Sequence, residues 1–142
     1  GKVLKVTSSK SEFEIAQEVM KGNYSSFVKI YDVKVIDNNR IIVIKELKLD
    51  SDIENLYYTV SSMLDSQGLP IQYLDHFDEE QYEEQSGEVI DDDTKKFMEE
   101  LYGIIHDYRR LGIEASDIRP ENMGRDKQGN LKAFDIEDRS RL

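Results

Sequence analysis

An apolar stripe in the second half of the chain constrains the fold more than any other feature. Its members recur at steps of four, three, four and three residues and are Phe97, Leu101, Ile104, Tyr108 and Leu111. This spacing places large side chains on one face of a helix, which must therefore pack against a core. We expect that helix to begin at Asp93 or Thr94 and to end at Gly112.

The start of the chain predicts a strand followed by a shorter helix. Residues 2–7 alternate apolar and polar side chains and are rich in β-branched types, as strands are. Ser9 and Ser11 each stand three residues before a glutamate, which makes two overlapping capping boxes at the start of a helix. That helix is expected to extend to about Lys21, because Gly22 ends it.

Two further strands are expected over residues 27–36 and 40–49. The residues between them are Asp37-Asn38-Asn39, which tolerate left-handed backbone and form local hydrogen bonds. The two strands should therefore form a hairpin.

A second helix is expected behind this hairpin. Ser51 and Glu54 form another capping box, and Gly68 and Pro70 end the apolar periodicity that follows it. Strands in the first fifty residues and helices after them predict an α+β fold.

The last thirty residues differ in kind from the elements before them. A polar segment, residues 113–124, directly follows the buried helix. A turn at 126–130 should pair residues 122–125 with 131–134 as a small hairpin, and Asp135 lies at its exit.

Charge is concentrated in one stretch of the chain. The net charge is −11, and residues 75–93 hold ten Asp or Glu and no Lys or Arg. So acidic a chain is not expected to bind nucleic acid, whose phosphates require a basic face. The stretch is interpreted as a solvated surface insertion, as a docking surface for a basic protein partner, or as a mimic of nucleic acid.

Several other classes of protein and site are excluded by composition. No run approaches the ~20 apolar residues of a membrane-spanning helix, and no signal peptide is recognisable, so a soluble cytoplasmic protein is expected. The chain has no Cys, which excludes disulfides and thiolate metal sites, and its two His are too few for a His-based metal cluster.

Two short motifs near the C-terminus resemble those of protein kinases. Asp117-Ile118-Arg119-Pro120-Glu121-Asn122 matches the D-x-x-x-x-N catalytic loop, and Phe134-Asp135-Ile136 stands where the D-F-G motif follows. The chain thus resembles the protein-kinase-like superfamily, especially the small kinase-like proteins of bacteria and phages. The resemblance implies a minimal two-lobe fold. Residues 1–49 would be a reduced N-terminal lobe, residues 50–142 a reduced C-terminal lobe with the catalytic loop, and the two would form one structural unit.

The resemblance also implies a nucleotide partner, ATP, together with Mg²⁺. Asn122 and Asp135 would hold the Mg²⁺ through hard oxygen ligands. Asp117 would accept or orient the proton of the attacking hydroxyl. Arg119 would lie near the transferred phosphate.

The first fifty residues would supply the other nucleotide contacts. Lys5 would contact the α- and β-phosphates, held by a carboxylate of the helix after it. Glu12 has apolar residues at +3, +4 and +7, as an inward-facing residue should, but Glu14 is an alternative, and both can also act as helix caps. Residues 40–50 would be the last strand and the hinge of the N-terminal lobe, where Glu46 and Lys48 would face the adenine.

Some positions depart from the family pattern. Ala115 and Ser116 stand where kinases carry His and Arg, and Glu137 stands where D-F-G has its glycine. The sequence shows neither the glycine-rich loop before Lys5 nor an activation segment.

Three functions therefore stay open at this point. The first is a kinase that phosphorylates a protein, a small molecule or itself. The second is a kinase-like pseudoenzyme or inhibitor that acts on a protein partner through its acidic surface. The third is an acidic α+β domain with an accidental motif match. A homodimer is a further expectation, because a short chain can complete its core with a second copy.

Overall fold

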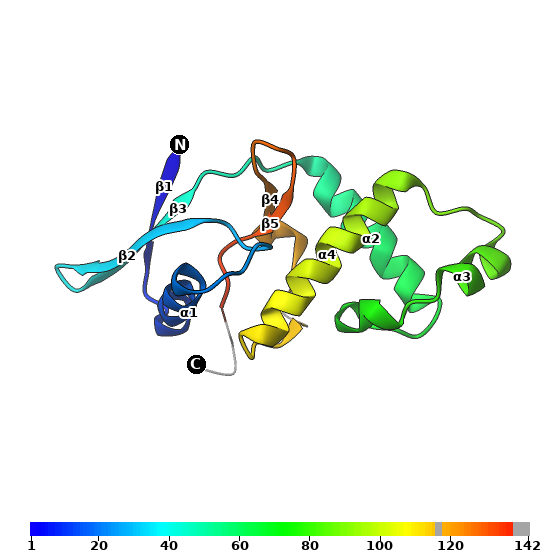
Figure 1. Cartoon of the computed structure of the whole chain (residues 1–142), viewed down its shortest axis with the longest axis horizontal. Coiled ribbons are helices and arrows are strands. Elements are labelled where there is room, and N and C mark those ends of the chain that lie inside the picture. Colours follow the sequence, from blue (N-terminus) through cyan, green and yellow to red (C-terminus); the bar gives the residue numbers. More distant parts are fainter. Residues whose placement is uncertain (116–117, 138–142) are drawn as a thin grey trace.

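The computed structural model describes residues 1–115 and 118–137 as an α+β arrangement with small antiparallel sheets and several helices (Figure 1). The α+β class expected from the sequence is confirmed at this level. In chain order the elements are β1 (Lys2–Thr7), α1 (Lys10–Lys21), β2 (Ile30–Ile36), β3 (Asn39–Lys45), α2 (Ser51–Asp65), η1 (Ile71–His76), α3 (Glu79–Ser86), α4 (Asp92–Arg110), η3 (Pro120–Asn122), β4 (Met123–Arg125) and β5 (Leu131–Ala133).

The larger sheet has the strand order β1–β3–β2, and both pairings are antiparallel. The turn between β2 and β3 is shorter than the three residues expected. Asp37 and Asn38 have φ of 49° and 68°, and Asn39 already belongs to β3. Positive φ at both central residues is typical of a two-residue type I′ turn, whose twist matches that of the flanking strands.

Both strands of this hairpin are shorter than the predicted 27–36 and 40–49. Residues 27 and 28 pair with β5 instead of β3, since the N–H of Val28 donates to the carbonyl of Ala133 at 2.9 Å, whereas the carbonyl of Lys29 still accepts the N–H of Lys45. Residues 46–49 leave β3, since Lys48 exchanges two backbone hydrogen bonds with Arg125. Apolar periodicity cannot reveal such a change of partner.

Two helices begin earlier than the sequence indicated. Asp50 caps α2 through a backbone N–H two residues on, so the expected cap Ser51 already lies inside the helix. Asp91 caps α4, with its Oδ1 accepting the N–H of Thr94 at 2.7 Å, so the helix does not begin at Asp93 or Thr94. The carboxylate of an aspartate satisfies the orphan N–H groups of the first turn as well as a serine hydroxyl does.

The long helix α4 packs as the apolar stripe predicted. Every member of the stripe is buried, and Leu101 and Ile104 are wholly inaccessible. Helix α2 crosses α4 (Figure 1) and contributes Val60 and Leu64 to the same core cluster. Ile15 and Val19 of α1 belong to that cluster too, so one core connects both halves of the chain.

The small hairpin β4–β5 lies between the sheet and the crossed helices (Figure 1). The predicted pairing is confirmed, and the N–H of Phe134 extends it by donating to the carbonyl of Asn122 at 2.9 Å. Strand β4 also bonds to Lys48 and β5 to residues 26–28, so both edges of the hairpin are joined to the first half of the chain. Gly124 permits this approach, because a Cβ there would lie only 2.8 Å from the Cβ of Leu47.

The acidic stretch forms a surface element at the end of the molecule away from the larger sheet (Figure 1). Helix α3 lies within it and has no buried residue. Across the described parts of the chain, no helix combines the length and the apolar character that crossing a bilayer requires.

The core packing generates a test of stability. Leu101→Ala removes a side chain with no exposed surface, and we expect it to lower the free energy of unfolding by about 2–5 kcal/mol. Leu49→Ala makes the same chemical change at a side chain that is 70% exposed, and we expect a change within about 0.5 kcal/mol. Urea denaturation followed by circular dichroism measures both, and equal effects would contradict the core described here.

Candidate functional site

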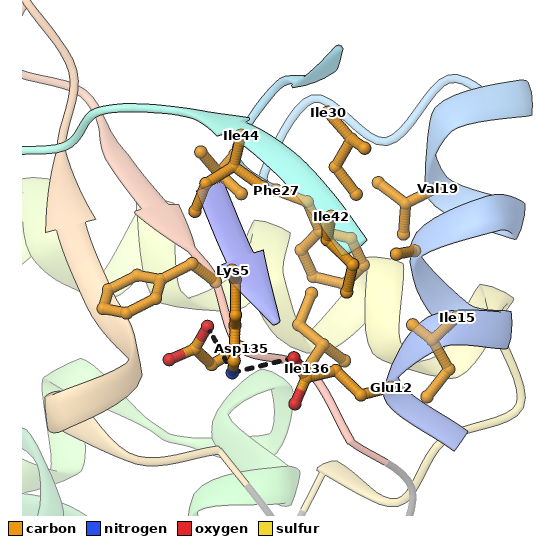
Figure 2. A pocket seen from close by; sticks show the side chains of 13 residues that line it. Lys5, Glu12, Ile15, Val19, Phe27, Ile30, Ile42, Ile44, Asp135 and Ile136 are labelled. Carbon is orange, nitrogen blue, oxygen red and sulfur yellow. Dashed lines mark ion pairs between the residues drawn. The ribbon is translucent and has the colours of Figure 1, made fainter. Parts of the chain in front are cut away.

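Three charged side chains from distant parts of the sequence meet at one point. The ammonium group of Lys5 on β1 lies 2.7 Å from Oε1 of Glu12 on α1 and 2.9 Å from Oδ1 of Asp135, just beyond β5. Figure 2 shows the lysine reaching between the two carboxylates. The structure thus assembles three of the residues that the kinase resemblance singles out.

The lysine pairs with Glu12 and not with Glu14, which the sequence had left open. Glu14 points away and approaches Lys10 at 3.9 Å across one helical turn, with 43% of its side chain exposed. Glu12 stands in the first turn of α1, where its own N–H donates to the Ser9 hydroxyl at 3.1 Å. The N–H of Ser9, which the carboxylate would accept in a capping box, donates instead to Oγ1 of Thr7 at 3.0 Å, so the Glu12 carboxylate is available to Lys5.

Burial and charge act against each other in this cluster. Burial acts to lower the pKa of Lys5, but its bonds to Glu12 and Asp135 outweigh that effect and raise the pKa above its usual value. Burial raises the pKa of Glu12, and the nearby Lys5 offsets this only in part. A buried carboxylate is costly without a partner, so Glu12 depends on the lysine for its charge.

Asp135 owes its position to the hairpin and to an unusual backbone conformation. Its φ is 54°, in the left-handed region that few residues other than glycine adopt. The chain leaves β5 through Phe134, which is still bonded to Asn122, and then turns sharply. Strained residues of this kind persist where the surrounding structure fixes them, often at functional sites.

Glu137 takes a role that the sequence did not reveal. Its Oε1 accepts a hydrogen bond from the Ser9 hydroxyl at 2.9 Å, so the segment after Asp135 is tied to the first turn of α1. The positive end of the helix dipole favours a carboxylate at this place. Ser9 and Glu137 are 128 positions apart, and no local pattern in the sequence signals their contact.

An apolar cavity of about 30 Å³ lies beside the three charged groups (Figure 2). Ile15, Val19, Phe27 and Ile42 are among the side chains that line it. The space is enough for about two water molecules, whereas small-molecule sites are usually about 300 Å³ or more. A nucleotide would therefore have to lie outside this cavity, with the lysine at the boundary.

The other predicted site residues occupy separate positions. Asn122 ends η3, half-buried, opposite Phe134 in the hairpin, which brings it close to Asp135 along the ladder. Arg119 is exposed and caps η3, and its carbonyl accepts the N–H of Asn122. Glu46 and Lys48 are exposed, and none of these residues lines the cavity at Lys5. Asp117 lies outside the described residues.

The oxygen ligands suit the Mg²⁺ that the resemblance implies. A carboxylate and an amide are hard donors, and Asp135 and Asn122 would need water and phosphate oxygens to complete six ligands. No group of three or more His, Cys, Asp or Glu in residues 1–115 and 118–137 is arranged to hold a metal. The donor set therefore fits a metal that arrives with a phosphate ligand better than one held by protein alone.

No protein-family model matches the chain.

Loss of Lys5 should reveal how strongly the carboxylates depend on it. In Lys5→Met, Glu12 and Asp135 lose their partner, and we expect unfolding free energy to fall by about 1–3 kcal/mol at pH 8, a range that allows for the partial exposure of the pair. This loss of stability should be smaller at pH 4.5. Burial already raises the pKa of Glu12, and removal of Lys5 raises it further. More of the Glu12 carboxyl is therefore protonated at that pH, and a neutral carboxyl does not need the lysine as a partner.

Denaturant titrations at both pH values measure this difference. Lys10→Met serves as the matched control, since Lys10 is 77% exposed and 3.9 Å from its partner. A destabilisation of Lys5→Met that is the same at pH 8 and pH 4.5 would show that the charge cluster does not act as described.

Proposed function

We propose that this protein is a kinase-like phosphotransferase that binds ATP with Mg²⁺ and transfers a phosphoryl group to a hydroxyl. The observation that carries the proposal is the Lys5–Glu12 ion pair with Asp135 on its other side. Residues of a strand, a helix and a hairpin exit converge there, and each is the type that phosphoryl transfer uses at that place.

Lys5 supplies a positive charge for the phosphates. Its raised pKa keeps the ammonium protonated at neutral pH, and Glu12 fixes its direction from the buried side. Transfer of the γ-phosphoryl group demands positioning and neutralisation of charge more than covalent chemistry. A lysine held by a buried carboxylate meets both demands.

Asp135 and Asn122 would hold the Mg²⁺, which supplies charge neutralisation between the phosphate oxygens. In the structure Asp135 is paired with Lys5. On nucleotide binding the phosphates would replace Asp135 as a partner of the ammonium group, and Asp135 would be released to serve as a ligand. Glu12 would keep its contact with Lys5 throughout.

The acceptor hydroxyl would attack the γ-phosphorus. A bond then forms between that oxygen and phosphorus, the bond to the oxygen bridging the β- and γ-phosphates breaks, and ADP leaves. The hydroxyl proton would pass to Asp117, a role taken from the sequence alone. Arg119, exposed beside the same loop, would face the transferred group.

Nucleotide binding is the direct test. ATP–Mg²⁺ at 100 times its dissociation constant should stabilise the protein by about 2.7 kcal/mol in a thermal unfolding assay. We expect Lys5→Met and Asp135→Asn to weaken binding by about tenfold or more. Asp117→Asn should bind but transfer no phosphoryl group to an acceptor.

Asp32→Asn is the matched control for Asp135→Asn, because Asp32 lies on the exposed face of β2 with 52% of its side chain accessible. It should bind ATP as the unaltered protein does. An absence of any thermal shift at millimolar ATP–Mg²⁺ would refute the proposal, as would a shift that Asp135→Asn leaves intact.

A second candidate function is favoured by helix α3. Its residues Glu79, Glu80 and Glu84 are exposed and Glu83 is half-buried, and none of the four makes an ion pair in the described parts of the chain. Such a surface suits the capture of a basic protein, in which case the nucleotide site would be dispensable. This pseudoenzyme hypothesis explains the acidic helix but not the cluster of Lys5, Glu12 and Asp135, so we rank it second.

Neutralising α3 separates the two candidates. Changing its four glutamates to glutamine should leave ATP binding unaltered if the protein is a phosphotransferase. If it acts as a docking protein, the same change should abolish binding to a basic partner, and added salt should weaken that binding in the unaltered protein. Affinity purification at low and high salt measures both effects.

A further inference from the structure

A second hollow, unrelated to the acidic surface, is lined by lysines. It lies between the end of α1, the segment 22–30 and the β4–β5 hairpin, and its volume is about 390 Å³. Lys29, Lys45 and Lys132 line it from three different segments. Small-molecule sites usually have volumes of about 300–1,000 Å³, so the hollow is large enough for a ligand.

The lysines of this hollow carry charge that the fold leaves uncompensated. Lys45 is joined to Lys29 by a backbone hydrogen bond of 2.9 Å, and Lys2 stands directly opposite Lys45 across the β1–β3 ladder. Like charges placed opposite each other on a sheet are destabilising. No ion pair joins Lys2, Lys29 or Lys45 to any residue in 1–115 or 118–137.

Other contacts hold the lysines where they are. Tyr31 lies beneath two of them, with its ring centroid 4.5 Å from Nζ of Lys2 and 4.9 Å from Nζ of Lys29. Lys132 donates to the carbonyl of Ser25. An aromatic face or a neutral carbonyl attracts a cation without cancelling its charge, so the positive potential of these lysines remains.

One acidic residue also lines the hollow, but it does not neutralise it. Oδ1 of Asp126 accepts the backbone N–H groups of Gln128 and Asn130 and so stabilises the turn of the small hairpin. The lining therefore has three positive charges against one negative charge, in a protein whose net charge is −11. A local excess of this sign, within a protein so acidic, favours an anionic ligand at this place.

We propose that this hollow binds a phosphorylated small molecule. A phosphate monoester carries about −1.5 to −2 charge at neutral pH and three acceptor oxygens, which several ammonium groups can share; a single carboxylate brings only one negative charge and two oxygens. Met20, Leu47 and Tyr24 supply an apolar and aromatic wall for the rest of the ligand. The ligand is thus a phosphate ester with an apolar or aromatic body.

The position of the hollow gives such a ligand a route to the Lys5 cluster. Val19, Phe27, Val28 and Ile30 line both this hollow and the cavity beside Lys5, so they form the wall between the two. A ligand in the hollow packs against that wall and restricts its side chains. The hollow and the Lys5 cavity thus share one wall, but binding in the hollow does not depend on the proposed phosphotransfer.

Titration with phenyl phosphate, followed by two-dimensional NMR of the backbone amides, tests the inference. The buffer contains EDTA, because without a divalent ion the carboxylates around Lys5 repel phosphate. We expect shifts to concentrate at Tyr24, Lys29 and Lys132, and Lys29→Gln/Lys45→Gln to weaken binding by about tenfold or more. Inorganic phosphate, which lacks the apolar body, should bind more weakly than phenyl phosphate.

The controls separate this site from the nucleotide site. Lys96→Gln/Lys127→Gln removes the same charge from exposed positions outside the hollow and should bind phenyl phosphate normally. Lys5→Met should also bind it normally, even though that change is expected to weaken ATP–Mg²⁺ binding by about tenfold or more. Failure of ATP binding alone therefore refutes only the phosphotransferase proposal.

Three results would overturn the inference. They are the absence of any shift, shifts centred on Lys5, and equal weakening in the two double variants, which would show attraction to net charge alone. Lys29 is exposed and Lys45 half-buried, so their replacement should leave the fold intact, and the same spectra verify this.

Discussion

The ammonium group of Lys5, shared by Glu12 and Asp135, is the interaction on which the arrangement of this protein depends. It joins the edge strand of the sheet, the helix that covers the sheet, and the end of the small hairpin. A carboxylate buried as deeply as that of Glu12 must have a cation or lose its charge. The lysine therefore has two functions, to hold three elements together and to keep a buried acid ionised.

The small hairpin is what makes this meeting possible. It is bonded along one edge to Lys48 and along the other to residues 26–28, so its exit has a fixed position relative to the sheet. The left-handed backbone of Asp135 then aims the carboxylate back toward β1. Glu137 adds a second tie from the same segment to the capping serine of α1. Two residues after β5, Asp135 and Glu137, thus carry contacts that connect the first ten residues to the end of the described chain.

Local patterns predicted the elements better than their limits. The stripe of α4 was recognisable because burial of one helix face imposes a period on the sequence, and all its members are buried. The helix starts were misplaced because Asp91, Asp92 and Asp93 are equally good caps by type, and only the geometry selects one. The strands were overextended because Phe27, Val28 and Lys48 lie in runs that suit β2 and β3 but pair with the small hairpin instead.

The candidate site was predictable in part for a similar reason. Spacing along α1 favoured Glu12, since a residue with apolar neighbours at +3, +4 and +7 faces inward, and motif order indicated Asp135. Contacts between residues far apart in sequence produce no such pattern of spacing or motif order. The bond from Ser9 to Glu137 and the row of Lys2, Lys29 and Lys45 depend on strand register and chain folding, which no short window of sequence contains.

The separation of charge along the molecule has a physical consequence of its own. Acidic residues gather on and around α3, which lies at the end of the molecule away from the larger sheet (Figure 1). Lys2 and Lys45 pair within that sheet, and Lys29 directly precedes β2. A body charged in this way has a permanent electric dipole, and a dipole turns in any external field. Near a positively charged surface the protein would adsorb through α3 and leave its lysines facing the solvent, so its orientation there would be set before any specific contact formed.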